Sequence, residues 1–170
     1  REVMELFTLG EGKGYHEKDI QEAARAFTGW TLDENNKFTF DQKKHDPGDK
    51  EVLGEKVING EDVLNVLLSR KQTARFVTRK IWRFLAGNRM PMTLRTNLID
   101  VFYESGFNIK RLIREILISD DFYSSRGKII KSPIDLMAGT IVNFDIQAKN
   151  YYDIVNSMSA MDLTLMNPPN

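Results

Sequence analysis

The sequence predicts a mainly α-helical fold: an irregular multi-helix domain with a small two-stranded β excursion around residues 37–54. Apolar residues recur at helical spacing over most of the 170 residues. Glycines and small polar residues stand where these apolar stretches begin and end, as they do at helix caps. Only the stretch with Phe38 and Phe40 alternates with polar neighbours, as a strand does. An apolar fraction of 41% over this length suffices for one core, so we expect residues 1–170 to form a single helical domain.

Two helices are predicted before the β excursion. The first is the apolar stretch that precedes Gly10, a residue suited to the left-handed position after a helix. The second begins near His16, with Asp19 in its first turn, where a carboxylate interacts favourably with the helix dipole. It ends before Gly29 and leaves Trp30 at its exit. The apolar positions of this second helix share one face: Ile20, Ala23, Ala24 and Phe27.

The β excursion is predicted from the alternation at Phe38–Phe40 and from the turn signal that follows it. Asp46-Pro47-Gly48-Asp49 carries proline and glycine at positions that β-turns favour. Glu51–Leu53 then reads as a second short strand before Gly54. We expect these two strands to pair with each other.

Helical periodicity returns after the excursion and continues to the end of the chain. Asn108 and Ser132 are typical N-cap residues, and Pro133 suits the first helical position. Asn150 is predicted to cap the last helix. The predicted helices cover residues 61–68, 73–85, 94–103 and 109–118, one that starts at Pro133, and one built on Ile154, Val155, Met158 and Met161.

The composition excludes several classes of site. Lys and Arg total 24 and Asp and Glu total 24, so the formal net charge is +0. A domain that binds nucleic acid usually has a basic excess, so we expect no nucleic-acid partner. The absence of cysteine excludes disulfides, thiolate metal ligands and a cysteine nucleophile. No long uncharged apolar run is present, so we expect no membrane span in this chain.

The familiar cofactor and catalytic motifs are also missing. Gly10–Gly14 has the glycines of a phosphate-binding loop, but a helix precedes it and Gly14, not Ser or Thr, follows Lys13. Asp33–Lys37 lacks the central glycine of a calcium loop and has a lysine at a ligand position. No Gly-x-Ser-x-Gly or His-Glu-x-x-His motif is present. The sequence therefore predicts no cofactor and no metal site.

Several segments together resemble the bacterial domain-of-unknown-function 1800 family. They follow one another in the family's order along almost the whole chain. The family pattern begins upstream of Arg1 and continues beyond Asn170 into a segment rich in glycine and tryptophan. We therefore expect this chain to be a fragment of a longer protein, truncated at both ends. The matching segments are residues 1–10, 23–30, 45–54, 73–84, 131–133 and 167–170.

The resemblance implies a location and a partner rather than a reaction. Members of this family resemble exported bacterial proteins, which implies the periplasm or the cell envelope, although no signal peptide is visible in the sequence. Their genes often neighbour those of a second uncharacterised family, which is sulfatase- or phosphatase-like. A protein from that second family is therefore the partner that the resemblance implies.

His45 and Asp46 form the most chemically suggestive pair and are the catalytic candidates. Metal phosphohydrolases use adjacent His and Asp ligands, and an Asp also orients an imidazole for acid–base catalysis. A metal site needs further ligands, however, and the only other histidine is His16, which is expected at a helix start. Asp46 before Pro47 is also an ordinary turn residue whose carboxylate accepts from the backbone two residues on. We favour this structural interpretation of the pair.

A cationic stripe on the helix of residues 73–85 supplies further binding candidates. Arg75, Arg79 and Arg83 follow one another at intervals of four, joined by Lys80 and the neighbouring Trp82. Guanidinium groups match the geometry of phosphate, sulfate and acidic sugars, so the stripe is a candidate site for an anion. The alternative is a solvated face or a set of internal ion pairs.

Arg25, Trp30 and Lys50 complete the set of binding candidates. Arg25 lies in an otherwise apolar stretch, where a half-buried arginine usually pairs with a carboxylate. Trp30 is suited to stack on a sugar, but such aromatic residues more often pack in a core or at its rim. Lys50 follows the predicted turn and is not explained by helix packing.

Two hypotheses about function follow. The first is a module of the cell envelope that binds a partner protein or a cell-surface carbohydrate, which predicts an exposed apolar or aromatic patch. The second is a metal- or acid–base-dependent hydrolase centred on His45 and Asp46, which predicts that His45 lies in a cleft near further polar ligands. An imidazole that bonds to the backbone under the hairpin would speak against the second hypothesis.

Overall fold

The computed structural model describes residues 1–87, 89–147 and 150–164. Their contacts group into two compact units, which divide between Arg126 and Gly127. Unit 1 comprises residues 1–126 and unit 2 starts at Gly127. The expectation of one single domain stays a prediction. The segment 167–170, which contributes to the family resemblance, lies outside the described residues.

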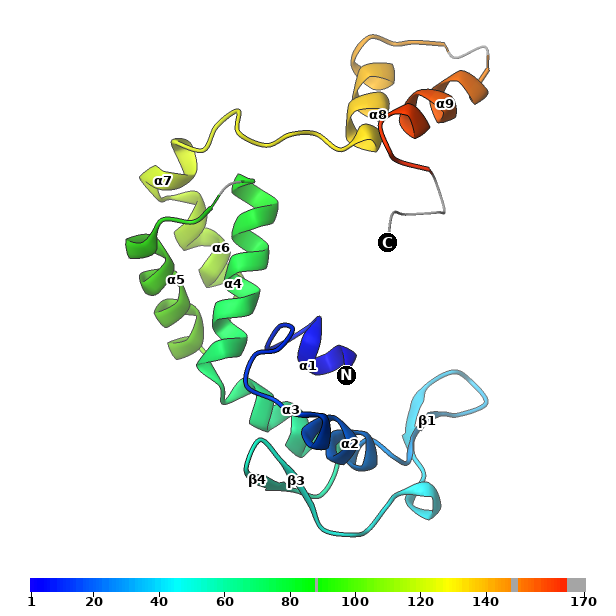
Figure 1. The fold of residues 1–170 in the computed structure, drawn as a ribbon, viewed down its shortest axis with the longest axis vertical. Helices are drawn as coiled ribbons and strands as arrows, with labels where there is room; N and C mark the ends of the chain where they lie inside the picture. The colour runs from blue at the N-terminus through cyan, green and yellow to red at the C-terminus, as the bar shows by residue number, and fades with distance from the viewer. Residues whose placement is uncertain (88, 148–149, 165–170) are drawn as a thin grey trace. The chain divides into compact units, whose positions relative to one another are not determined.

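Helices account for most of the described structure in both units (Figure 1), so the prediction of a mainly α fold is confirmed. No described helix is both long enough and apolar enough to span a membrane. The helices of unit 1 are α1 (Glu2–Glu5), α2 (Glu17–Ala26), α3 (Gly60–Leu68), α4 (Lys71–Ala86), α5 (Met92–Glu104), α6 (Ile109–Leu117) and α7 (Asp120–Tyr123). Those of unit 2 are α8 (Pro133–Asn143) and α9 (Tyr152–Ala160).

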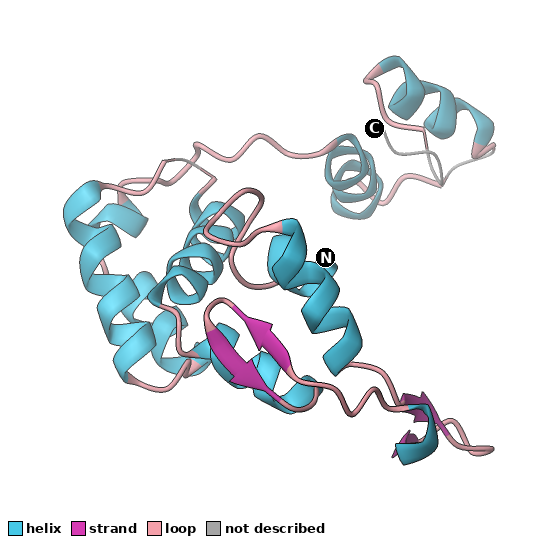
Figure 2. Ribbon diagram, turned by 60° about the horizontal axis from the view of Figure 1, so that its bottom comes forward, coloured by secondary structure: helices cyan, strands magenta, loops and turns pink. Residues whose placement is uncertain are grey.

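The β excursion consists of two hairpins, and the predicted strand pairing is wrong. The strands are β1 (Trp30–Leu32), β2 (Phe38–Phe40), β3 (Lys50–Val52) and β4 (Glu55–Val57), with a short 3-10 turn, η1 (Gln42–Lys44), between the hairpins. β1 pairs antiparallel with β2, and β3 pairs antiparallel with β4 (Figure 2). The two strands that we expected to pair with each other are β2 and β3. Instead, β2 pairs with β1 and β3 pairs with β4.

Local turn chemistry explains this pairing. The Asp33 carboxylate accepts hydrogen bonds from the Asn35 and Lys37 amides and closes the β1–β2 connection. Leu53 and Gly54 both have positive φ, at 54° and 80°, and form a two-residue turn of the kind that tight hairpins favour. Short loops bring sequence neighbours together at a small entropic cost, so each strand pairs with the strand nearest to it in the chain.

Two hydrophobic clusters form the core of unit 1. One joins α1, α2, α3 and the β3–β4 hairpin, which packs against α2. The other joins α4, α5 and α6 around Trp82 and Phe102. The first cluster contains Met4, Leu9, Ile20, Ala23, Ala26, Val52, Val57, Val63 and Leu67, and the second contains Ala74, Trp82, Ala86, Met90, Leu98, Ile99, Phe102, Leu112 and Ile116.

Most predicted helix starts are confirmed by cap geometry. His16 is the N-cap of α2, and its backbone amide donates to the Asp19 carboxylate. The Asn108 and Ser132 side chains accept from the third amides of α6 and α8, respectively. The last helix differs slightly, because Tyr151 is its N-cap and the Asn150 side chain accepts from the Tyr152 amide.

Two features of the helices were not expected. α1 stops at Glu5, well before Gly10, because the chain turns and the amides of Leu9 and Gly10 both donate to the Met4 carbonyl. The short helix α7 was not predicted, although Ser119 caps it by accepting from the Phe122 amide. Four residues are too few for an apolar period to be visible in the sequence.

Candidate functional site

The seven candidate residues fall into two places in unit 1. Five of them lie around the end of α2, the β1–β2 hairpin and the loop that follows it: Arg25, Trp30, His45, Asp46 and Lys50. The other two, Arg75 and Trp82, lie on α4, and Trp82 belongs to the second hydrophobic cluster. The candidates therefore do not converge on one cleft.

Arg25 and Asp46 form a two-point ion pair. Arg25 Nε donates to Asp46 Oδ2 at 2.8 Å, and Arg25 Nη2 donates to Asp46 Oδ1 at 3.2 Å. Arg25 Nη1 also donates to the Glu22 carboxylate and, at 3.1 Å, to the Asp49 carbonyl. One guanidinium thus ties the loop of Asp46 to α2, as expected for a half-buried arginine.

This pairing keeps Asp46 ionised. Hydrogen bonds from Arg25, and then from the Gly48 amide, lower the pKa of Asp46 from its ordinary value of 3.8 to about 2. The hydrogen bonds that Arg25 donates to Asp46 and, second, to Glu22 raise the pKa of Arg25. An acid–base catalyst works best with a pKa near the operating pH, so this carboxylate is poorly suited to move protons at neutral pH.

His45 is bound to the backbone under the hairpin. Its Nδ1 lies 2.9 Å from the Thr28 carbonyl oxygen, so we assign the proton to Nδ1 as the donor of this hydrogen bond. Its Nε2 is buried and has no hydrogen-bond partner in the described part of the chain. The ring packs edge-on against Phe40, with centroids 5.3 Å apart. The next amide, of Asp46, donates to the Thr28 hydroxyl at 2.9 Å.

Gly29 permits this close approach of the loop to the end of α2. Its φ of 87° is in the left-handed region. A Cβ at this position would lie 2.8 Å from the Asp41 carbonyl oxygen and 3.1 Å from the His45 Cβ. The glycine is therefore required both by its backbone conformation and by the packing of His45.

Lys50 is a buried lysine with a structural role. Only 4% of its surface is exposed. Its Nζ donates to the Gly48 carbonyl at 2.9 Å and to the Ile58 carbonyl at 3.1 Å. These bonds join the loop before β3 to the segment after β4, so the ammonium group serves the fold rather than a ligand at the surface.

Trp30 begins a hairpin whose two faces differ in polarity. The indole packs edge-on between Phe27 and Phe38, with ring centroids 5.1 Å and 5.2 Å away. Register places Trp30 opposite Phe40 and Leu32 opposite Phe38, so these four side chains share one face of the hairpin. Leu32 and Phe38 are each 60% exposed and Phe40 is 45% exposed. We call this set, Trp30, Leu32, Phe38 and Phe40, the hairpin face.

The geometry around His45 gives the hydrolase hypothesis no support. The imidazole bonds to the backbone under the hairpin, which is the arrangement that speaks against it, and the Asp46 carboxylate is held by Arg25. In residues 1–87, 89–147 and 150–164, no three His, Asp or Glu side chains gather in a way that could hold a metal ion. The catalytic role of this pair stays a prediction.

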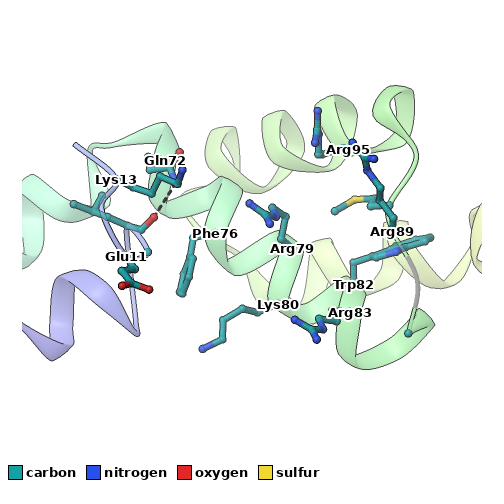
Figure 3. A pocket seen from close by; sticks show the side chains of 14 residues that line it. Glu11, Lys13, Gln72, Phe76, Arg79, Lys80, Trp82, Arg83, Arg89 and Arg95 are labelled. Carbon is teal, nitrogen blue, oxygen red and sulfur yellow. Dashed lines mark hydrogen bonds between the residues drawn. The ribbon is translucent and has the colours of Figure 1, made fainter. Parts of the chain in front are cut away.

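The second candidate surface is a groove beside α4, with a volume of about 800 Å³. Trp82, whose side chain is 1% exposed, contributes to its wall, whereas Arg75 lies outside it and donates to Gln72 Oε1 at 3.2 Å. The labelled cations in Figure 3 extend from Lys13 at one end to Arg89 and Arg95 at the other. The groove is lined by Leu9, Gly10, Glu11, Lys13, Gln72, Phe76, Arg79, Lys80, Trp82, Arg83, Gly87, Arg89, Met90 and Arg95.

Comparison with protein families gives one result. Residues 1–170 match the family described as "Protein of unknown function (DUF1800)". The chain belongs to the DUF1800 family. Comparisons with curated proteins and with solved structures found no match. The resemblance seen in the sequence segments is thus confirmed over the whole DUF1800 chain.

Sequence reasoning found part of the α4 groove of this DUF1800 chain. Helical periodicity placed Arg79, Arg83 and Lys80 on α4, but it could not place Lys13, Arg89 or Arg95 beside them. Those three come from the loop after α1, from the segment after α4 and from α5. No spacing in the sequence links these elements, and only their packing brings the charges together.

Proposed function

We propose that this DUF1800 chain is a binding module of the bacterial cell envelope that docks a partner protein through the hairpin face. The observation that carries the proposal is the exposure of Leu32, Phe38 and Phe40 on one side of a two-stranded hairpin. Exposed apolar surface of this kind marks interaction sites in folded proteins. These side chains are about half exposed, so burying the rest of each would contribute about 1 kcal/mol, roughly half of the value for a fully exposed side chain.

The base of the hairpin is rigidly held, which favours binding. Arg25, His45 and the Gly29 turn fix the entry and exit of the hairpin against α2. Neither β1 nor β2 pairs with any other described strand, so the hairpin also has a free backbone edge. A pre-ordered apolar surface loses little conformational entropy when a partner docks, and a free edge accepts an added strand.

The hairpin face suits a protein better than a carbohydrate. Stacking on a sugar ring needs an aromatic face presented flat to solvent, but the Trp30 indole is packed edge-on between two phenylalanines. The aliphatic Leu32 adds to an irregular apolar surface that fits side chains of a partner. The partner implied by the family resemblance is the neighbouring sulfatase- or phosphatase-like protein, and the envelope location rests on the same resemblance.

A binding assay with that sulfatase- or phosphatase-like protein tests the proposal. The Phe38→Glu variant places a charge on the hairpin face opposite Leu32, and we expect it to weaken binding about tenfold or more. Phe84→Glu is the matched control, because Phe84 is 82% exposed on α4 and lies outside the hairpin face. Isothermal titration calorimetry with both variants measures the dissociation constants.

Two outcomes of the binding assay would contradict the proposal. If Phe38→Glu binds as tightly as the unmodified chain, or if Phe84→Glu loses as much affinity, the hairpin face is not the docking site. Circular dichroism of both variants shows that a loss of binding is not a loss of folding.

A further inference from the structure

The α4 groove concentrates positive charge in a chain with no net charge. Its lining includes one carboxylate, that of Glu11. The same lining includes the cations Lys13, Arg79, Lys80, Arg83, Arg89 and Arg95. The whole sequence contains as many Lys and Arg residues as Asp and Glu residues. The excess of positive charge is therefore a local feature of the groove. A concave surface lined by one sign of charge attracts ligands of the opposite sign.

Most of these cations lack an internal acidic partner. Lys13, Arg79, Arg83 and Arg89 make no ion pair with any residue that the structure describes. Lys80 donates to the Leu6 carbonyl at 3.1 Å and lies over the Phe76 ring, again without a carboxylate.

Some cations elsewhere in unit 1 do have a carboxylate partner. Arg25 pairs with Asp46, and Arg70 pairs with Glu55. Lys71 likewise pairs with Asp100. The four groove cations without an ion pair therefore hold no carboxylate that an outside anion would have to displace.

The groove is long rather than round. Its lining follows α4 from Gln72 to the end of the helix, a distance of roughly 20 Å at about 1.5 Å per residue. Arg79 and Arg83 stand about one helical turn apart along this line, and Lys13 and Arg89 lie toward opposite ends (Figure 3). A single small anion contacts only a part of such an array, whereas a chain with repeated anionic groups contacts several cations at once.

The groove also has apolar surface between its charges. Phe76 is partly exposed in the lining, whereas Trp82 and Met90 are only 1% and 6% exposed and add little to this surface. An acidic sugar matches this mixture, because its ring has apolar C–H faces and its carboxylate or sulfate groups accept hydrogen bonds from guanidinium forks. Nucleic acid is a weaker fit, because proteins that bind it usually carry a basic excess overall.

We propose that the α4 groove binds an extended acidic polysaccharide through several carboxylate or sulfate groups at once. This site is separate from the hairpin face, and the proposal stands whether or not a protein docks there. Binding of one polymer by several cations makes affinity rise with ligand length. It also makes affinity fall as salt increases, because exposed charges are screened.

Calorimetric titration with galacturonate and its oligomers tests this proposal. We expect the hexamer to bind about tenfold or more tightly than the monomer, and to bind more weakly at high salt. The double variant Arg79→Ala/Arg83→Ala should lose about tenfold or more of the hexamer affinity. The matched control is Arg111→Ala/Arg114→Ala, which removes the same charge from exposed positions on α6 outside the groove.

Several results would overturn the proposal. Three of them are equal affinity for the monomer and the hexamer, equal loss of affinity in the two double variants, and tighter binding of single-stranded DNA of matched charge than of the hexamer. A neutral hexasaccharide of glucose should show no binding, and binding as tight as that of the acidic hexamer would also count against an anion site. Circular dichroism confirms that both double variants stay folded.

Discussion

At the scale of single residues, Asp46 joins two parts of the fold. It accepts hydrogen bonds from Arg25 on α2 and from the Gly48 amide two residues on in its own turn. The second bond is the turn contact that an aspartate before Pro-Gly predicts. The sequence did not specify the contact with Arg25. It predicted only that Arg25 would pair with a carboxylate.

The Arg25–Asp46 pair predicts a pH dependence of stability. The pKa of Asp46 lies at about 2 in the folded chain, below its ordinary value of 3.8. The stabilisation from its ionised form is therefore complete above about pH 4 and is lost as the pH falls toward 2. We expect Asp46→Asn to have a lower free energy of unfolding at neutral pH, with the difference from the unmodified chain shrinking between pH 4 and 2.

Urea denaturation at a series of pH values measures this difference. Asp41→Asn is a suitable control, because Asp41 also accepts from the backbone two residues on but has only an exposed lysine as its ion-pair partner. If the difference between Asp46→Asn and the unmodified chain stayed constant from pH 7 to 2, ionisation of Asp46 would not be its cause.

At the scale of elements, the start of α3 lies directly against the base of the β1–β2 hairpin. A Cβ on Gly60 would lie 2.5 Å from the Phe27 ring and 2.7 Å from the Trp30 ring. These rings are packed against each other, so a Cβ at Gly60 would press on both of them. The absence of a side chain at Gly60 therefore lets α3 support the hairpin.

Glycine-to-alanine substitutions at two helical positions should have opposite effects. We expect Gly60→Ala to lower the free energy of unfolding by about 1–3 kcal/mol, because it overpacks the hairpin base. Gly139→Ala in the middle of α8 should raise the stability of that helix by about 0.5–1 kcal/mol, because its Cβ would meet only atoms 3.9 Å or more away.

Chemical denaturation followed by circular dichroism distinguishes these cases. A neutral Gly60→Ala variant would show that the Phe27 and Trp30 rings shift easily, and the hairpin face would then be less rigid than proposed. A destabilising Gly139→Ala variant would show that α8 has a packing partner at this position.

At the scale of the whole molecule, unit 1 has the features of an independent folding unit. Both hydrophobic clusters of the described chain that hold the helices and hairpins together lie within residues 1–126. Residues 128–132, which follow it, are exposed and outside any helix or strand. Exposed segments of this kind, outside helices and strands, are where boundaries between independently folding parts of a chain usually fall.

A chain that ends at Arg126 should fold on its own. Both tryptophans, Trp30 and Trp82, lie in unit 1, so their fluorescence reports on unit 1 alone. We expect the shortened chain to keep the emission spectrum of the full chain and a thermal midpoint within a few degrees of it, roughly the change that accompanies 1 kcal/mol. An emission spectrum typical of solvent-exposed tryptophan would instead show that residues 127–170 are needed for folding.

Much of the fold was predictable because it depends on local interactions. Asn108 and Ser132 bond to amides within the first turn of their own helices, so the helix starts follow from a few neighbouring residues. The stop of α1 was not predictable in the same way. It depends on the Met4 carbonyl, which accepts from Leu9 and Gly10 as the chain turns into the core.

The candidate sites were predictable in part. The sequence marked Arg25, Asp46 and Lys50 as residues that helix packing leaves unexplained, and all three make polar contacts that hold the hairpin region together. It did not mark Leu32, Phe38 and Phe40 as one surface, because the pairing of β1 with β2 sets which side chains share a face.

The sequence by itself determined the helical class, most helix starts and the family of this chain, because these depend on periodicity, caps and short segments. Tertiary structure decided which strands pair, which carboxylate neutralises Arg25, and which cations meet beside α4. The physical reason is distance along the chain. Lys13 and Arg89 approach one groove only because the loop after α1 packs against α4, and no local pattern in the sequence encodes that contact.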